Sequence, residues 1–172
     1  IKKIISSSIE TKQLILNDDA FIKKIENAVD AITNAFTKGN KVLFCGNGSS
    51  AADAQHLAAE LSGRVYINRK ALPAEALHCN TSYLTAVAND YNYDVIYARL
   101  IEGIANEGDV VVGLSTSGNS PNILKAGEAV KQKKGRTIGF TGASGGTMKN
   151  ISDHLFNVPS TATPRIQESH IM

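Results

Sequence analysis

The chain has 172 residues, of which 42% are hydrophobic and 20% charged, and its formal net charge at pH 7 is +2. This length and composition predict one globular domain with a single core. The scattered basic residues give little support to nucleic-acid binding or a membrane-surface role, and no apolar stretch reaches the ~20 residues of a spanning helix.

Residues 1–37 are predicted to form two helices. Apolar residues recur about every 3.6 positions, from Ile4, Ile5 and Ile9 onward. Residues 17–19 (Asn-Asp-Asp) predict a break, with an aspartate capping the second helix. The mixture of charged and apolar residues differs from a secretory signal. An amphipathic arm ahead of the first strand must bury its apolar stripe, and a second subunit is one natural place for it.

Strand-like and helix-like segments alternate after this arm. Short apolar runs predict strands at 41–46, 75–80, 109–115, 136–142 and 154–160, and amphipathic stretches predict helices at 51–63, 91–106, 120–135 and from 164 onward. Continuous apolar strands alternating with helices are typical of a parallel sheet covered on both faces. The sequence therefore predicts an α/β fold with a doubly wound sheet.

The cysteines and two of the histidines fall in or beside the predicted strands. Cys45 and Cys79 form neither a disulfide framework nor a C-x-x-C pair. Because both lie in apolar runs, we expect buried thiols in a reducing cytoplasm. His78 and His154 are expected to be structural.

Two polar loops follow predicted strands and lead into helices, at the end of the sheet where open α/β folds bind ligands. Their residues are Asn47, Gly48, Ser49 and Ser50 in the first, and Ser115, Thr116, Ser117 and Ser120 in the second. We expect Ser49 or Ser50 to cap the first helix and Ser120, followed by Pro121, to cap the next. Two converging helix N-termini with hydroxyl donors and no lysine suit a phosphate monoester. The alternative is that these serines serve only as caps.

Signals for a bound nucleotide are weak. The G-x-x-x-x-G-K-[ST] motif of P-loop hydrolases is absent. Residues 46–51 (GNGSSA) match a loose G-x-G-x-x-A, but no acidic residue ends a strand about 20 positions later, since Glu75 lies too far along. We therefore expect no nucleotide cofactor and no redox chemistry.

His56 and Glu60 are spaced one helical turn apart and share a face of the predicted helix, with Asp53 on a neighbouring stripe. They form either an exposed ion pair or a catalytic or metal-binding pair. Their position directly after the first polar loop favours the second interpretation. Gln167 and His170 likewise share a face of the last predicted helix.

Together these segments resemble the sugar isomerase (SIS) domain, and within it the phosphoheptose isomerases. The resemblance covers the helical arm, CGNGSSAADAQHLAAELSGR (45–64), AVANDYNYDVIYAR (86–99), GLSTSGNSPNILKA (113–126) and RIQESH (165–170). It implies one SIS domain over residues 1–172, with a flavodoxin-like, doubly wound, five-stranded parallel sheet. It also implies a cytoplasmic homotetramer in which the arm, residues 1–37, packs between subunits.

The activity implied by the resemblance is conversion of sedoheptulose 7-phosphate to D-glycero-D-manno-heptose 7-phosphate through an enediol, for lipopolysaccharide or capsule synthesis. Ser50, Ser115, Ser117 and Ser120 would hold the phosphate, with Thr116, Asn47, Gly48 and Ser49 beside them. Arg64, Asn89 and Asp90 would line the sugar site, and Gln167 would also contact substrate. Glu60 would move the proton between C1 and C2, with His56 as its neighbour.

The resemblance also implies a zinc ion, seen in some members, bound by His56, Glu60 and Gln167. The family pattern places a histidine, the expected acid and a further zinc ligand, eight positions after Gln167. That position lies beyond Met172, so either the last helix is truncated or this chain lacks that catalytic group. Because the predicted last helix stops soon after it starts, we expect truncation.

Two other functions remain open at this point. Some SIS proteins are non-catalytic partners of a replication initiator or sugar-phosphate sensors, and others act on different phosphosugars. Glu60 and His56 discriminate an enzyme from a non-catalytic scaffold, because a scaffold does not need them. Glu60 follows Ser50 by ten positions, which is about 15 Å along a helix. An extended heptose phosphate is shorter than this, so either the sugar lies along the helix within one subunit or Glu60 meets a substrate held by a neighbouring subunit. We expect the second arrangement.

Overall fold

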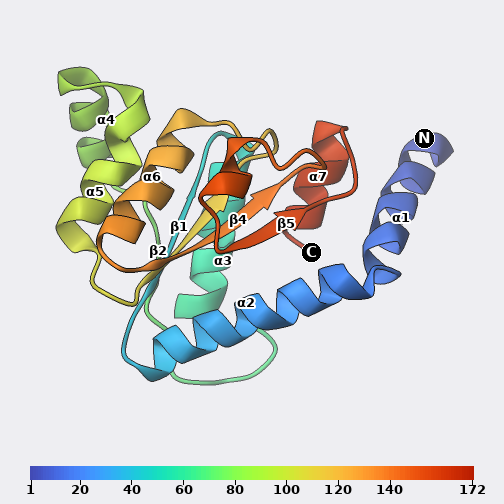
Figure 1. Cartoon of the computed structure of the whole chain (residues 1–172), viewed down its shortest axis with the longest axis horizontal. Coiled ribbons are helices and arrows are strands. Elements are labelled where there is room, and N and C mark those ends of the chain that lie inside the picture. Colours follow the sequence, from blue (N-terminus) through green and yellow to red (C-terminus); the bar gives the residue numbers. More distant parts are fainter.

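The structure is a computed structural model that describes residues 1–172. Its strands are β1 (Val42–Gly46), β2 (Ala74–Ala76), β3 (Val110–Leu114), β4 (Arg136–Thr141) and β5 (His154–Asn157). They form one parallel sheet in the order β2-β1-β3-β4-β5 (Figure 1). This is the strand order of flavodoxin-like, doubly wound sheets. The predicted fold class is confirmed.

Helices cover both faces of the sheet. One face carries α2 (Asp19–Thr37), α3 (Ser49–Ser62) and α7 (Thr163–His170), and the other carries α4 (Thr81–Asp90), α5 (Ile96–Ile104) and α6 (Pro121–Gln132). The residues of β1 alternate between the two layers. Val42 and Phe44 pack under α2 and α3, whereas Leu43 and Cys45 pack under α5 and α6. Every residue of β1 and β3 is buried, as the continuous apolar runs predict.

The register of β1 and β3 places the two polar loops side by side. Val42 pairs with Val110 at one end, and Gly46 pairs with Leu114 at the other. The loops that begin at Asn47 and Ser115 therefore leave the same edge of the sheet from neighbouring strands. From β1 the chain continues to β2 on one side, and from β3 it continues to β4 on the other, so the strand order changes direction between β1 and β3. This is the topological switch point, where such folds bind ligands.

The N-terminal arm consists of α1 (Lys2–Leu16) followed by α2. Asp18 caps α2 as predicted, because its carboxylate accepts a hydrogen bond of 3.0 Å from the backbone N–H of Phe21. Figure 1 shows α1 standing apart from the sheet on the right, close to α7. Ile4, Ile5 and Ile9 are 63%, 53% and 59% exposed, so this part of the apolar stripe of α1 has no cover within the chain, whereas Ile15 near the end of α1 is buried.

The segment between β2 and β3 differs from its prediction. The strand predicted over 75–80 is short, because Asn80 caps α4 by accepting a hydrogen bond from the N–H of Tyr83. The helix predicted over 91–106 begins only at Ile96, after a 3-10 turn, η1 (Tyr93–Val95). A second 3-10 turn, η2 (Thr147–Asn150), precedes β5.

The cysteine prediction was half right. Cys45 is fully buried in β1, whereas Cys79 is exposed, because it lies in the turn after β2 and not in a strand. None of the helices combines the length and the hydropathy that a bilayer-crossing segment requires.

Candidate functional site at the carboxyl edge of the sheet

The first polar loop makes a sharp turn into α3. The residue that precedes the helix is Gly48, whose φ of +56° is unfavourable for any residue with a Cβ. The expected cap by Ser49 or Ser50 was wrong, because both are already the first residues of α3. Ser50 is buried, and the Ser49 hydroxyl donates a hydrogen bond of 2.7 Å to Oε1 of Gln167. The loop is thereby joined to α7.

The second polar loop gathers three hydroxyl groups. Oγ of Ser115 lies 2.9 Å from Oγ of Ser120 and 3.5 Å from Oγ of Ser117. Ser120 precedes α6 with Pro121 at the first helical position, as predicted, but its hydroxyl makes no capping bond. The hydroxyls of the loop therefore face one another beside the free N–H groups at the start of α6. Thr116 is half-buried next to them.

A pair of asparagines joins the two loops. The side-chain amides of Asn47 and Asn122 donate to each other's Oδ1 at 2.9 and 2.8 Å, and the hydroxyl of Tyr93 donates to Asn47 at 3.2 Å. Asn122 is 1% exposed. These bonds hold the N-termini of α3 and α6 together. The sequence analysis did not identify Asn122 or Tyr93. The only signal in the sequence was that the amide of Asn122 comes two positions after the predicted helix cap, Ser120.

A third loop, residues 142–147, supports the second. The carbonyl of Gly118 accepts from the N–H of Met148 at 2.9 Å, and Oδ1 of Asn119 accepts from the N–H and hydroxyl of Thr147, each at 2.9 Å. Gly118 has a φ of +68°, and a Cβ there would collide with the carbonyl of Gly145. The third loop is therefore a brace under the hydroxyl cluster.

His56 and Glu60 lie on one face of α3, with His56 Nε2 3.6 Å from Glu60 Oε1. Their side chains are 62% and 36% exposed, so the pair is open to solvent in the isolated chain. Because α3 runs without interruption from Ser49 to Ser62, Glu60 lies about 15 Å along the helix from Ser50. Glu60 and the hydroxyl loops thus lie toward different ends of α3, with His56 between them.

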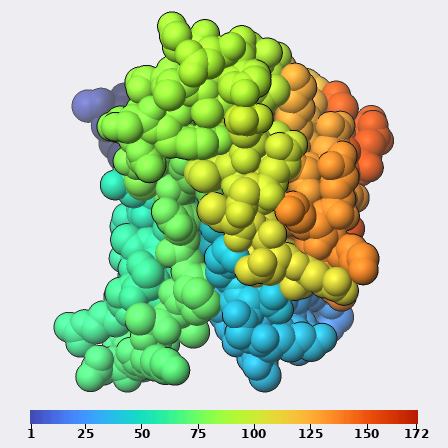
Figure 2. All heavy atoms as spheres, turned by 90° about the vertical axis from the view of Figure 1, so that its left-hand side faces the viewer, coloured from blue at the N-terminus to red at the C-terminus, as the bar shows by residue number.

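The remaining predicted sugar-site residues are not joined to the loops by any hydrogen bond. Arg64 is exposed just after α3. The segment between α3 and β2, residues 63–73, projects from the body at the lower left of Figure 2. Asn89 donates to Oδ1 of Asp90 at 3.0 Å, and both are exposed at the end of α4. The structure brings together the serine loops, Asn47 and Gln167, and leaves these three residues outside the group.

The predicted zinc ligands fit a metal only in part. An imidazole nitrogen and a carboxylate oxygen 3.6 Å apart have the chemistry and spacing of two zinc ligands. The amide oxygen of Gln167 instead accepts from Ser49. No set of three or more His, Cys, Asp or Glu side chains is grouped closely enough to hold a metal ion.

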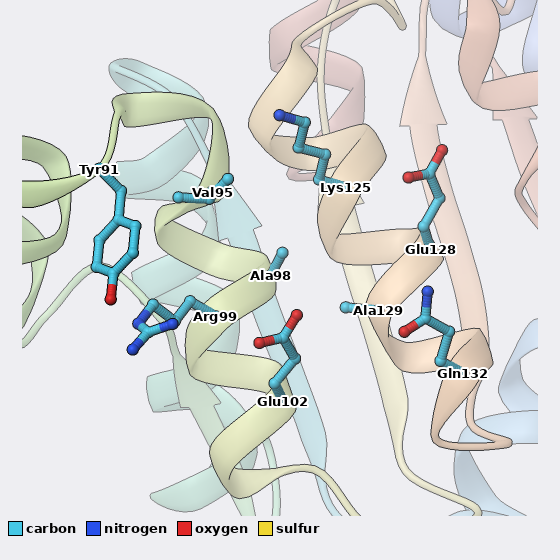
Figure 3. A pocket seen from close by; sticks show the side chains of 9 residues that line it. All are labelled: Tyr91, Val95, Ala98, Arg99, Glu102, Lys125, Glu128, Ala129 and Gln132. Atoms are coloured by element: carbon cyan, nitrogen blue, oxygen red, sulfur yellow. The ribbon is translucent and has the colours of Figure 1, made fainter.

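A groove between α5 and α6 holds none of the predicted site residues. In Figure 3, Glu102 of α5 points toward α6, which carries Lys125 and Glu128, whereas Arg99 of α5 turns away toward Tyr91. The guanidinium of Arg99 stacks 4.4 Å from the centre of the Tyr91 ring. The charged side chains that line the groove are of both signs, so the groove favours neither an anionic nor a cationic ligand.

Comparison with known proteins matches this arrangement. Residues 11–142 match the family model of the SIS domain. That span includes β1, β3 and both serine loops. The fold and the paired loops at its switch point are therefore those of a SIS domain protein.

Individual relatives narrow this class. The chain is 51% identical to the phosphoheptose isomerase of Clostridium acetobutylicum over 172 residues, which are 100% of this chain and 88% of that one. Solved phosphoheptose isomerases from Francisella tularensis and Neisseria gonorrhoeae superpose with TM-scores of 0.94 and 0.92, at 36% and 38% identity, each covering 99% of this chain and 90% of the other. The chain belongs to the SIS domain family and, within it, to the phosphoheptose isomerases.

Proposed function

We propose that this protein is an isomerase that converts sedoheptulose 7-phosphate to D-glycero-D-manno-heptose 7-phosphate. The observation that carries the proposal is the hydroxyl cluster of Ser115, Ser117 and Ser120 beside two adjoining helix N-termini, in a chain 51% identical to a phosphoheptose isomerase. We propose that the reaction takes place in the cytoplasm and that its product is used to make the heptose of surface lipopolysaccharide or capsule.

The serine loops are the proposed phosphate site. The free N–H groups at the starts of α3 and α6 carry partial positive charge, which favours a dianion without a lysine. Hydroxyls of Ser115, Ser117 and Ser120 add donors on one side, and Ser50 adds one on the other, joined by Ser49 once its hydroxyl releases Gln167. Asn47 and Asn122 keep the two sides at a fixed separation.

Proton transfer is the proposed role of Glu60. An enediol pathway requires a base that takes a proton from one sugar carbon and returns it to the next. Glu60 and His56 form an acid–base pair at 3.6 Å, exposed to an incoming sugar. Arg64, Asn89 and Asp90 would bind sugar hydroxyls.

The placement of Glu60 supports a site shared between subunits. One heptose phosphate spans less than the ~15 Å from Ser50 to Glu60. The exposed stripe of α1, with Ile4, Ile5 and Ile9, supplies an apolar surface for assembly. We propose a homotetramer in which the loops of one subunit face Glu60 of another. Light scattering at micromolar concentration should give four times the chain mass, and a stable monomer would contradict the proposal.

We propose His56 and Glu60 as zinc ligands. Gln167 would be a third ligand once its amide oxygen no longer accepts the hydrogen bond from Ser49. A bound zinc ion would polarise a sugar carbonyl oxygen. Metal analysis of the purified protein and of His56→Ala tests this. Equal zinc content in both proteins would place any zinc elsewhere.

The test of the function is a coupled or proton-NMR assay with sedoheptulose 7-phosphate, run beside a hexulose phosphate of the same charge. We expect turnover of the heptulose phosphate and a much lower kcat/KM for the shorter sugar. Saturable binding of the sugar phosphate without turnover would instead identify a non-catalytic SIS protein. Preference for the shorter sugar would identify a different phosphosugar isomerase.

A further inference from the structure

The last turn of α3, which carries Glu60, ends without the usual backbone cap. The final carbonyls of a helix have no partners inside the helix, and a glycine in the left-handed conformation often supplies N–H groups for them. Gly63 follows α3, but its φ of −90° is not left-handed, and its N–H donates only to the carbonyl of Ala59. The carbonyls of Glu60 and Leu61 therefore need donors from elsewhere in the chain.

Arg69 supplies these donors from outside the helix. Its Nη2 donates to the carbonyl oxygen of Glu60 at 2.8 Å, and its Nη1 donates to that of Leu61 at 2.8 Å. The carbonyl oxygens of Lys70 and Gly63 lie 3.1 and 3.4 Å from Nη1. No backbone N–H donates to the carbonyl of Glu60, so Arg69 is its only partner. The positive guanidinium also suits the partial negative charge at the C-terminus of a helix.

Arg69 also anchors the segment in which it lies, residues 63–70. This segment contains no helix or strand, it lies in the projecting part of Figure 2, and all of its residues except Arg69 are exposed. No other side chain of the segment makes a hydrogen bond. Further along, the N–H of Leu72 donates to the carbonyl of Leu61 at 3.2 Å. The segment is thus folded back onto the end of α3, and it includes Arg64, a proposed sugar-binding residue.

The position of Glu60 depends on this cap. Glu60 lies two residues before the end of α3, and the ends of helices fray. A base has to lie within about 3 Å of the group whose proton it takes, and a displacement of about 1 Å can cost about a hundredfold in rate. The guanidinium is planar and rigid, so its two Nη atoms hold two successive carbonyls of this turn in a fixed relation. The single nitrogen of a lysine could not occupy both places.

We propose that Arg69 is a positioning residue for the isomerase reaction, which fixes the last turn of α3 and so holds the carboxylate of Glu60 in its reactive place. Arg69 binds backbone carbonyls, so its effect on the reaction passes through Glu60. The inference rests on the proposed function, in which Glu60 is the base. A cap with a structural role alone would change the stability of the protein but not the turnover of its folded form.

The decisive variant is Arg69→Met, which keeps the apolar stem of the side chain and removes every donor. We expect kcat to fall at least tenfold, with a smaller loss in Arg69→Lys, which keeps the charge and one donor nitrogen. The inhibition constant of inorganic phosphate should stay within twofold of wild type, because the serine loops lie toward the other end of α3.

Two results would overturn the positioning role. The first is a kcat within twofold of wild type in Arg69→Met, or in Arg69→Lys if the first variant does not fold. The second is a loss of phosphate inhibition as large as the loss of kcat, which would indicate a general loosening of the structure.

Lys70→Met is the matched control, because Lys70 is an exposed cation of the same segment and its side chain makes no hydrogen bond. Its kcat should remain at the wild-type value. This comparison separates the loss of the cap from the loss of a positive charge.

Amide hydrogen exchange tests the anchor without an activity assay. The N–H of Leu72 donates to the same carbonyl of Leu61 as Arg69, so Arg69→Met should speed the exchange of Leu72 at least tenfold. The amide of Leu57, in the middle of α3, should exchange as in wild type. Unchanged exchange at Leu72 would overturn the anchor itself. A wild-type protein that turns over no sugar phosphate would overturn the proposed function, while exchange would still show whether Arg69 holds the segment. The two failures are therefore distinguishable.

Discussion

Asn47 and Asn122 bind each other through two reciprocal amide hydrogen bonds, at 2.9 and 2.8 Å, although 75 positions separate them in the chain. Asn122 is almost completely buried at the start of α6. The pair thus ties the loop after β1 to the helix after β3, and it fixes the separation of the two helix N-termini that are proposed to bind phosphate.

Removing this tie should weaken substrate binding more than folding. Asn122→Ala deletes both bonds and leaves Asn47 with the Tyr93 hydroxyl alone, which should cost about 1–3 kcal/mol of unfolding free energy. We expect KM for the sugar phosphate to rise at least tenfold, measured by the isomerase assay, with stability measured by urea unfolding. Asn34→Ala removes an exposed asparagine of α2 and should change neither. An unchanged KM in Asn122→Ala would show that the loops hold their spacing without the pair.

The hydroxyl cluster gives a second prediction. Ser117→Ala removes one donor from the proposed phosphate site, and hydrogen bonds to a charged group contribute about 1.5–3 kcal/mol each. KM should therefore rise about ten- to a hundredfold, with little change in melting temperature because Ser117 is exposed. Ser144→Ala, in the bracing third loop, is the matched control and should bind substrate normally. Equal affinities in the two variants would place the phosphate elsewhere.

Residues close in sequence were predicted well, and partners distant in sequence were not. The runs VLFCG and VVVGL identify β1 and β3 because a strand buried on both faces is apolar at every position. The two serine loops and the pair of His56 and Glu60 were likewise visible, since their residues are neighbours in the chain. The bonds of Asn122 and of Ser49 cross 75 and 118 positions, and only the folded sheet determines them. α4 was missed because its cap, Asn80, follows a strand-like run.

The proposed base gives a third prediction. Glu60→Gln keeps the shape of the side chain and removes its ability to take a proton, so kcat should fall at least about a hundredfold while sugar-phosphate binding is largely kept. Isomerase assays stopped at fixed times, with wild-type and variant protein, measure this change in kcat. Near wild-type turnover would end the assignment of Glu60 as the base.

A mixing experiment tests whether the site is shared. Glu60→Gln subunits retain intact serine loops, and Ser117→Ala subunits retain the base. If Glu60 acts on substrate held by a neighbour, mixed tetramers should contain sites with both intact components. Activity above the sum of the two variants is the expected result. Strict additivity would mean that each subunit works with its own loops and its own Glu60.

The two thiols should differ greatly in reactivity. Burial raises the pKa of the Cys45 thiol to about 12, so almost none of it is thiolate at neutral pH, and its side chain is fully covered. Cys79 is exposed in the turn after β2. A chromogenic disulfide reagent at pH 8 should label one thiol per native chain and two after unfolding. Cys79→Ser should abolish the native reaction, and rapid labelling of that variant would contradict the burial of Cys45.

The last prediction concerns acid stability at the opposite edge of the sheet. Burial alone would raise the pKa of Asp109, but hydrogen bonds from the backbone N–H groups of Asn106 and Lys41, and the Lys41 ammonium at 2.7 Å, together hold it below its ordinary value. A carboxyl whose pKa is lowered on folding contributes stability that is complete above its unfolded value of about 3.9 and is lost as the pH falls toward its folded value.

Asp109→Asn leaves the Lys41 ammonium without its partner, so we expect a loss of about 2–4 kcal/mol at pH 7. The loss should shrink as the pH falls from 5 toward 2.5, because the wild-type carboxyl is then being protonated as well. Urea unfolding of both proteins across this pH range measures the difference. Asp153→Asn is the control for a more exposed aspartate, since its side chain and that of Lys131 are both 40% exposed. A difference for Asp109→Asn that stays constant with pH would show that its charge does not stabilise the fold.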